Sequence, residues 1–165
     1  MHPLLVRSAA ELTVREQIDA LEQAARESIA TGELVQTHHD GTTDEGNEEA
    51  DHFFAKDVYC RGLWIPAGCL VVGRLHVQSR VCIVAAGRCR WVDEFHQQPI
   101  EASAPWVGEF KAGSKTAVYA YEDTYWVAVT GTSMTDPQEI LHTLSVSNHD
   151  QYRKLIGKLI GQKEV

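Results

Sequence analysis

The sequence predicts an all-β core, folded as an antiparallel sandwich or jelly-roll barrel, with an N-terminal helix and short C-terminal helices. Between residues 57 and 132, short β-rich runs follow one another. Turn signals such as Pro66-Ala67-Gly68 and Ala112-Gly113 separate them about every ten residues. On both sides of this region apolar residues recur at spacings of three and four, which is typical of amphipathic helices. At 165 residues the chain is long enough for one domain with a full core.

The first expected element is a helix over about residues 9 to 31, in a helical extension that spans residues 1–34. Ser8 followed by Glu11 is a capping-box pattern, which favours a helix start at this point. The apolar stripe of the helix is formed by Val14, Ile18, Leu21, Ala25 and Ile29, and Gly32 follows it.

Residues 35–56 are expected to form an acidic loop and the segment that leads into the barrel. Between Asp40 and Asp51 the chain carries six acidic residues and two glycines, without a single Lys or Arg. This composition predicts a solvated loop.

Residues 57–132 are expected to form the barrel, and residues 133–165 the C-terminal helical segments. The β-rich runs are VYCRGLWI, LVVGRLHV, VCIVAA, RCRWVDEF, APWVGEF, TAVYAY and TYWVAVTGT. After them Asp136 is an N-cap, Pro137 suits the first helical position and Glu139 the third, which predicts a short helix through about Leu144. A second apolar stripe near the C-terminus is formed by Tyr152, Leu155, Ile156, Leu159 and Ile160.

Composition limits the classes of partner. The net charge of −8 argues against a nucleic-acid polymer, because such binders need basic surface to replace phosphate counterions. No apolar run approaches the ~18 residues that would span a bilayer. We therefore expect no membrane contact and a cytoplasmic protein, in the host cytoplasm if its source is viral. The four cysteines lie in apolar runs without a CxxC pair, which favours reduced thiols over disulfides or zinc.

The arginines between Asp57 and Val92 are the main electrostatic feature. This stretch holds five arginines and one acid in a chain of net charge −8. Because strand side chains alternate between faces, Arg74, His76, Gln78 and Arg80 are expected to project to one side. Guanidinium groups suit carboxylate or phosphate ligands. The alternative is a solvated sheet face whose arginines pair with the acidic loop.

Three stretches of this region resemble the cupin superfamily of jelly-roll proteins. PAG, five residues, RLH and then VCIVAAG resembles the first cupin motif, in which a Gly-rich turn leads into a His-x-His strand. HFFAKDVYCRGLWIPAG and AGSKTAVYAYEDTYW resemble small phage and bacterial cupin-like proteins. The resemblance covers about residues 50 to 142 and implies a cupin-like barrel whose interior receives the His76 face. It does not select a function, since the superfamily holds enzymes, storage proteins and ligand sensors.

The resemblance implies a degenerate metal site. His76 stands at the first His position, but Gln78 stands at the second, the glutamate position falls near Val81 or Cys82, and Thr116 stands where a further His is expected. We therefore expect no cofactor. A divalent metal remains an alternative, with His76 and His52 as its ligands.

The function predicted from these observations is the binding or sequestration of a small anionic molecule, possibly nucleotide-like, as in a phage accessory protein. The candidate ligand-binding residues are Arg61, Arg74, His76, Gln78, Arg80, Lys115, Tyr119, Tyr121 and Trp126. One alternative is a metal-dependent or metal-free cupin enzyme, an oxygenase or an isomerase or epimerase, with His76 as general base and a Tyr as acid. Another alternative is a structural, oligomerising protein. A homo-oligomer, such as a homodimer, is expected because terminal helical extensions suit assembly. The missing ligand positions favour binding over catalysis.

Overall fold

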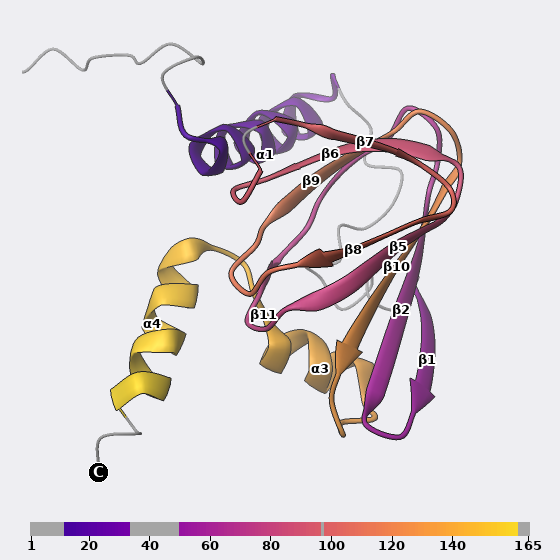
Figure 1. Ribbon diagram of the computed structural model, residues 1–165. Coiled ribbons are helices and arrows are strands. Elements are labelled where there is room, and N and C mark those ends of the chain that lie inside the picture. The colour runs from indigo at the N-terminus through magenta and orange to yellow at the C-terminus, as the bar shows by residue number, and fades with distance from the viewer. Residues whose placement is uncertain (1–11, 34–49, 97, 162–165) are drawn as a thin grey trace, which may run out of the picture.

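The computed structural model describes residues 12–33, 50–96 and 98–161. In these residues two antiparallel sheets face each other, and the chain ends in two helices that follow the last barrel strand (Figure 1). The five-stranded sheet has the order β1 (Asp51–Ala55), β2 (Val58–Ile65), β10 (Thr124–Gly131), β5 (Arg80–Ala86) and β8 (Trp106–Phe110). The four-stranded sheet has the order β3 (Leu70–Val72), β9 (Thr116–Ala120), β6 (Arg88–Asp93) and β7 (Ile100–Ser103). A two-stranded ribbon joins β4 (Leu75–His76) to β11 (Ser145–Val146).

The strand pairing is that of a jelly roll. The strands pair in a nested antiparallel series, in which β6 joins β7, β5 joins β8, β3 joins β9 and β2 joins β10. The series is therefore one long hairpin folded over on itself. The pairs β5·β10 and β6·β9 close the two sheets. The predicted antiparallel jelly-roll core with flanking helices is confirmed.

Three strands were not among the predicted runs; one is the two-residue β11, and the other two are the edge strands β1 and β7. β1 lies in the segment that was expected to lead into the barrel, and it adds an edge strand to the five-stranded sheet. β7 is only four residues long and lies at the edge of the other sheet, paired with β6 alone. Both strands depend on a neighbour for their hydrogen bonds, and short segments of this kind carry little periodicity of their own.

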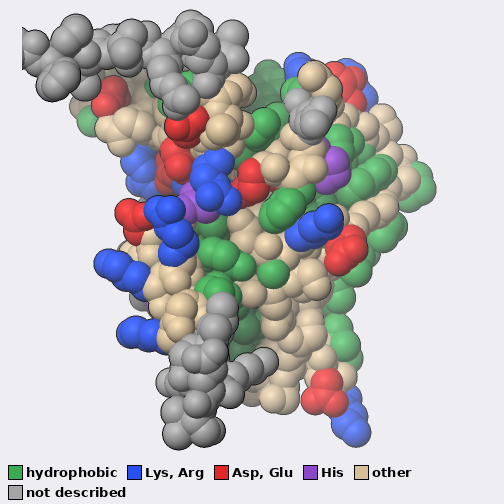
Figure 2. Space-filling view, turned by 60° about the vertical axis from the view of Figure 1, so that its left-hand side comes forward, with side chains coloured by type: hydrophobic (Ala, Val, Ile, Leu, Met, Phe, Trp, Pro, Cys, Tyr) green, Lys and Arg blue, Asp and Glu red, His purple; other side chains and the backbone are tan. Residues whose placement is uncertain are grey.

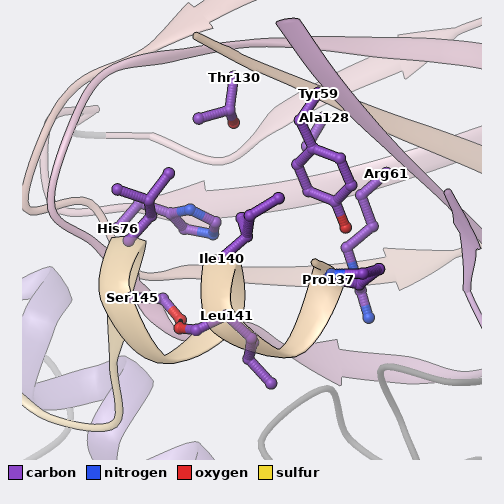
Figure 3. A pocket seen from close by; sticks show the side chains of 10 residues that line it. Tyr59, Arg61, His76, Ala128, Thr130, Pro137, Ile140, Leu141 and Ser145 are labelled. Atoms are coloured by element: carbon purple, nitrogen blue, oxygen red, sulfur yellow. Dashed lines mark hydrogen bonds between the residues drawn. The ribbon is translucent and has the colours of Figure 1, made fainter. Parts of the chain in front are cut away.

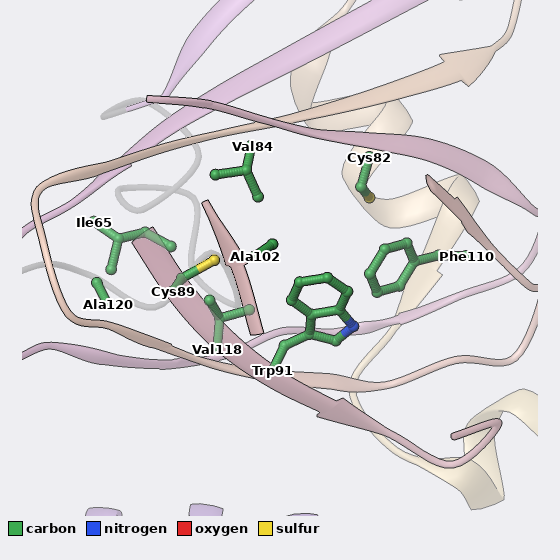
Figure 4. Close-up of a cluster of buried hydrophobic side chains, with 9 residues drawn as sticks. All are labelled: Ile65, Cys82, Val84, Cys89, Trp91, Ala102, Phe110, Val118 and Ala120. Carbon is green, nitrogen blue, oxygen red and sulfur yellow. The ribbon is translucent and has the colours of Figure 1, made fainter. Parts of the chain in front are cut away.

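Aromatic side chains fill the core between the sheets. Trp91, which is 1% exposed, lies with its ring centroid 4.5 Å from that of Trp106 and 5.8 Å from that of Phe110. Around them Ile65, Val84 and five further buried residues complete the cluster, from both sheets (Figure 4). All four cysteines are free thiols, and Cys82 and Cys89 belong to this core. Burial of this apolar surface is the main stabilising contribution to the barrel.

The described N-terminal helix, α1, runs over Val14–Thr31 and begins later than expected. Thr13 is its N-cap and forms a capping box with Glu16, and Gly32 closes it in the left-handed conformation with φ of 78°. The predicted cap, Ser8 with Glu11, lies outside the described residues. The helix lies against β6, with Ile18 as its one buried residue (Figure 1).

Ion pairs and hydrogen bonds of charged side chains hold α1 and α4 against the barrel. The ammonium group of Lys115, at the start of β9, contacts the carboxylates of Asp19 and Glu22 on α1. Glu94, just after β6, accepts from the backbone N–H of Lys115 at 2.9 Å, and its Oε1 lies 2.8 Å from Nε2 of His149 at the start of α4 (His149–Gly161). Figure 2 shows basic, acidic and histidine side chains gathered on this face of the molecule.

The helix α3 (Pro137–Leu144) begins as predicted. The Asp136 carboxylate accepts hydrogen bonds from the backbone N–H groups of Gln138 and Glu139, and Pro137 takes the first helical position. No helix in residues 12–33 and 50–161, residue 97 aside, is long and apolar enough to cross a membrane.

Candidate functional site

The inner face of the five-stranded sheet changes from apolar to polar along its strands. On β2 the inward residues are Tyr59, Arg61, Leu63 and Ile65, and the last two pack into the core. The neighbouring strand β10 runs the other way, so that Thr130 lies opposite Tyr59 and Ala128 lies opposite Arg61. Because side chains alternate between faces, the polar residues of both strands meet inside the same end of the barrel.

The helix α3 closes this polar end. Its apolar residues Ile140, Leu141 and Leu144 face the sheet, and Ser145 follows as its C-cap. Ser145 pairs with His76 through the ribbon of β4 and β11, which brings the imidazole to the same place. Arg74 donates from Nε to the Ser145 hydroxyl at 2.8 Å, and this hydroxyl donates to the Leu141 carbonyl at 2.6 Å.

A cavity of about 50 Å³ lies between the sheet and α3. In Figure 3 His76 lies on one side of it, Tyr59 and Arg61 lie on the other, and Ile140 points into the space between them. The ten described residues that line the cavity include no carboxylate; they are Tyr59, Arg61, His76, Ala128, Thr130, Pro137, Ile140, Leu141, Leu144 and Ser145.

The electrostatics around the cavity are those of a buried cationic site. Burial, together with the charges of Arg80, Arg61 and Arg74, lowers the pKa of His76 well below its usual value of 6.5. The imidazole is therefore neutral at pH 7, with one N–H donor and one acceptor nitrogen. Burial also lowers the pKa values of Arg61 and Arg80 from their usual range, which is the direction expected for cations removed from water.

Tyr59 contributes a protonated phenol. Burial is the main cause that raises its pKa to about 12, and the nearby charge of Arg61 acts in the opposite direction. The phenolic oxygen lies 2.7 Å from Nδ1 of His52 on β1. This hydrogen bond joins the cavity wall to β1.

Four of the nine predicted ligand-binding residues lie at or beside the cavity. Arg61 and His76 line it, and Arg74 borders it through Ser145. Arg80 is deeper, where it donates to the Ser114 hydroxyl at 3.1 Å and lies over the ring of Phe110. Its charge still acts on His76.

The structure places the other five predicted residues elsewhere. Gln78 donates to the carbonyl of Gly131 at 2.7 Å, and Lys115 pairs with α1. Trp126 packs in the core, with its ring centroid 5.7 Å from that of Trp91. Tyr119 is on the outer face of the four-stranded sheet, and Tyr121 follows that strand with its hydroxyl directed to Glu101. These five residues do not surround one ligand.

Sequence reasoning missed eight of the ten lining residues, on β2, β10, α3 and β11. Tyr59 is two residues before Arg61 on one strand, so alternation would have placed both side chains on the same face. Pro137, Ile140, Leu141 and Leu144 lie on a helix far along the chain. Their stripe is compatible with packing against any apolar surface, and nothing in it indicates a ligand.

The residues around His76 do not fit the divalent metal that the cupin resemblance implies. Three arginine charges act on the imidazole and would repel a divalent cation. Gln78 is hydrogen-bonded to Gly131, Thr116 is on β9 of the opposite sheet, and His52 is hydrogen-bonded to Tyr59. Among the described residues no three His, Cys, Asp or Glu side chains gather to hold a metal ion.

Comparison with known proteins identifies no related sequence. No family model matches the chain, and no curated protein matches it. Among solved structures, a cupin-2 domain protein from Shewanella frigidimarina is similar at a TM-score of 0.43 and 13% identity, over 62% of this chain and 89% of that one. A cupin 2 conserved barrel domain protein from Salinispora arenicola has a TM-score of 0.41 and 17% identity, over 48% of this chain and 71% of that one. The EutQ protein of Clostridium difficile has a TM-score of 0.42 and 13% identity, over 52% of this chain and 68% of that one.

The fold is a cupin-like jelly roll. This description rests on the nested strand pairing of the chain itself and on the sequence motifs around His76. It concerns the architecture of the barrel, and the chemistry of this cupin-like protein follows from the cavity residues.

Proposed function

We propose that this protein binds a small anion at the polar end of its barrel. The observation that carries the proposal is a partly open cavity lined by Arg61 and His76, to which Arg74 and Arg80 add their charge, while the described residues of its lining include no carboxylate. Several cationic groups around one partly buried space make its potential positive, which favours an anion there. A bound anion would accept hydrogen bonds from the guanidinium and the imidazole.

Binding is favoured over proton-transfer catalysis by the acid–base groups of the cavity. A general base works best with a pKa near the working pH, as does its partner acid. Here the pKa of His76 is lowered well below 6.5, and the pKa of Tyr59 is raised to about 12. The imidazole is therefore a weak base and the phenol a weak acid, and both suit hydrogen bonding to a ligand.

The cavity volume restricts the ligand. A water molecule needs roughly 10–15 Å³ of such space, so about 50 Å³ holds only a few non-hydrogen atoms. The ligand proposed is therefore a small anion, and not the nucleotide-like molecule predicted from the sequence. Sequestration of such a metabolite by a phage accessory protein is the biological role with which this proposal is compatible.

A thermal-shift and calorimetric titration tests the proposal. Acetate, phosphate and sulfate are the probes, and at least one is expected to raise the melting temperature by mass action. Arg61→Ala is expected to weaken binding at least tenfold, because it removes the charge that lines the cavity. Arg90→Ala is the matched control, since Arg90 lies exposed on the four-stranded sheet. Absence of binding by every probe, or equal weakening in both variants, would overturn the proposal.

A further inference from the structure

The two walls of the cavity differ in chemistry. The sheet side presents Tyr59, Arg61 and Thr130, and His76 adds its imidazole. The side formed by α3 presents four apolar side chains, those of Pro137, Ile140, Leu141 and Leu144. In Figure 3 the Ile140 side chain extends from α3 toward the polar groups. A ligand that fills this space touches cationic and apolar groups at once.

Inorganic anions match only one of these walls. Phosphate and sulfate are polar on every side, so that the oxygens facing α3 would lose water without gaining a hydrogen bond there. A short hydrocarbon chain attached to a carboxylate avoids this loss. Its carboxylate accepts from Arg61 and His76, and its methylene groups contact Ile140 and Leu141.

We propose that the cavity binds a short aliphatic monocarboxylate, with its carboxylate at Arg61 and His76 and its chain against α3. The inference rests on the proposed anion-binding function and names the ligand class of the same site. The volume of about 50 Å³ sets the length at roughly four to six non-hydrogen atoms, the size of acetate, propionate and butyrate.

Calorimetric titration with a series from formate to hexanoate tests the inference. Each methylene buried against α3 is expected to tighten binding about fourfold until the cavity is full, after which affinity falls. The variant Leu141→Asn is expected to remove the dependence on chain length while acetate still binds. Thr143→Asn, on the exposed side of the same helix, is the control and should keep the dependence. Circular dichroism checks that both variants are folded.

The outcomes separate the two proposals. Equal affinity for all chain lengths, or tighter binding of phosphate than of butyrate, would overturn the monocarboxylate and leave anion binding in place. Absence of binding by every anion would overturn both. If Leu141→Asn does not fold, Leu144→Ala replaces it, and unchanged dependence on chain length in that variant would also overturn the inference.

A second, independent observation concerns the outer face of the five-stranded sheet. In antiparallel sheets with one face in water, polar residues normally alternate with apolar ones. Here the strand register forms two apolar rows across this face. One row contains Phe53, Cys60, Val129 and Val81, and the other contains Val127, Ile83 and Val107. The rings of Trp64 and Tyr125, whose centroids lie 4.8 Å apart in a tilted arrangement, extend them.

Several of these side chains are strongly exposed. Val107 is 63% exposed, Phe53 55% and Trp64 53%. Two carboxylates, Asp51 and Glu109, lie at opposite ends of the rows, and Asp51 accepts from the Tyr125 hydroxyl at 2.8 Å. By contrast, the outer face of the four-stranded sheet carries Arg88, Arg90 and Glu101.

We infer that this apolar face binds a second copy of the chain in a two-fold symmetric dimer. A chain of net charge −8 repels its copies, and the apolar rows are where two copies can approach with little charge between them. Five strands about 4.8 Å apart make a face about 24 Å wide and roughly 20 Å long. With its side-chain relief, such a face offers an area comparable to the ~800 Å² per partner of a standard interface.

Sedimentation velocity of the full chain tests the dimer. The wild-type protein is expected at twice the chain mass at micromolar concentration, and Val107→Lys is expected at the chain mass. Leu70→Lys, which adds the same charge at an exposed Leu of β3, should leave the dimer intact. A monomeric wild-type protein would overturn the inference. A dimer that survives Val107→Lys and is lost in Ile156→Lys would also overturn it, and would place the interface on α4.

Discussion

The Nζ atom of Lys115 lies 3.0 Å from Oδ1 of Asp19, and the same ammonium contacts the Glu22 carboxylate. The Lys115 side chain is 3% exposed, and its hydrogen bonds to these carboxylates raise its pKa although burial alone would lower it. The contact joins α1 to the start of β9, which is 96 residues further along the chain. The amphipathic face of α1 buries only Ile18, so this ionic contact is a major attachment of the helix.

The first prediction concerns this attachment. Lys115→Met is expected to destabilise the protein by about 1–3 kcal/mol, because hydrogen bonds to charged groups are lost and two carboxylates remain side by side. In this variant the backbone amide hydrogens of α1 should exchange faster than those of the barrel strands. Lys111→Met, at an exposed position, is the control. Unchanged exchange in α1 would show that apolar contacts hold the helix.

The second prediction compares two glycines with nearly equal backbone angles. Gly87 has φ of 77° and Gly68 has φ of 81°, so Ala at either position costs roughly 1–2 kcal/mol in backbone strain. A Cβ at Gly87 would also lie 2.2 Å from the carbonyl oxygen of Asp123, whereas a Cβ at Gly68 meets no atom within 4 Å. Urea denaturation should therefore show a clearly larger loss for Gly87→Ala. Equal losses would contradict the steric argument.

The third prediction is a pH dependence from His76. Its pKa is lowered in the folded protein, so the unfolded chain binds more protons below pH 6.5. The contribution of His76 to the free energy of unfolding is therefore complete above pH 6.5 and is lost as the pH falls through the folded pKa. Urea denaturation between pH 7.5 and about pH 5 measures this loss, and His76→Gln should reduce its slope. Acetate should reduce it as well, since a bound anion stabilises the protonated ring. His142→Gln, at an exposed position, is the control.

The sequence predicted the elements whose signals are local. Asp136, Pro137 and Glu139 lie within four residues, and their caps form as expected. The arginines lie near His76, but not by the alternation along one strand that we expected: Arg74 precedes the two-residue β4, Arg80 begins β5, and Gln78 between them bonds Gly131. The pairing of Lys115 with α1 was not predicted, because it depends on where α1 packs on the barrel, and the residues near Lys115 do not indicate this position. Trp126 and Tyr119 were grouped by residue type, but one faces the core and the other faces solvent.

The nested strand pairing has a consequence for how the chain folds during synthesis. β2 pairs with β10, so the central pair of the five-stranded sheet joins residues 58–65 to residues 124–131. A ribosome-bound chain therefore cannot close the barrel before Gly131 has emerged, and the cavity must wait further for α3. Such high contact order makes folding slow, and until then the apolar β5 is exposed to other chains. Translation speed late in the message and chaperone supply should thus affect the yield of this protein more than that of a helical bundle of equal length.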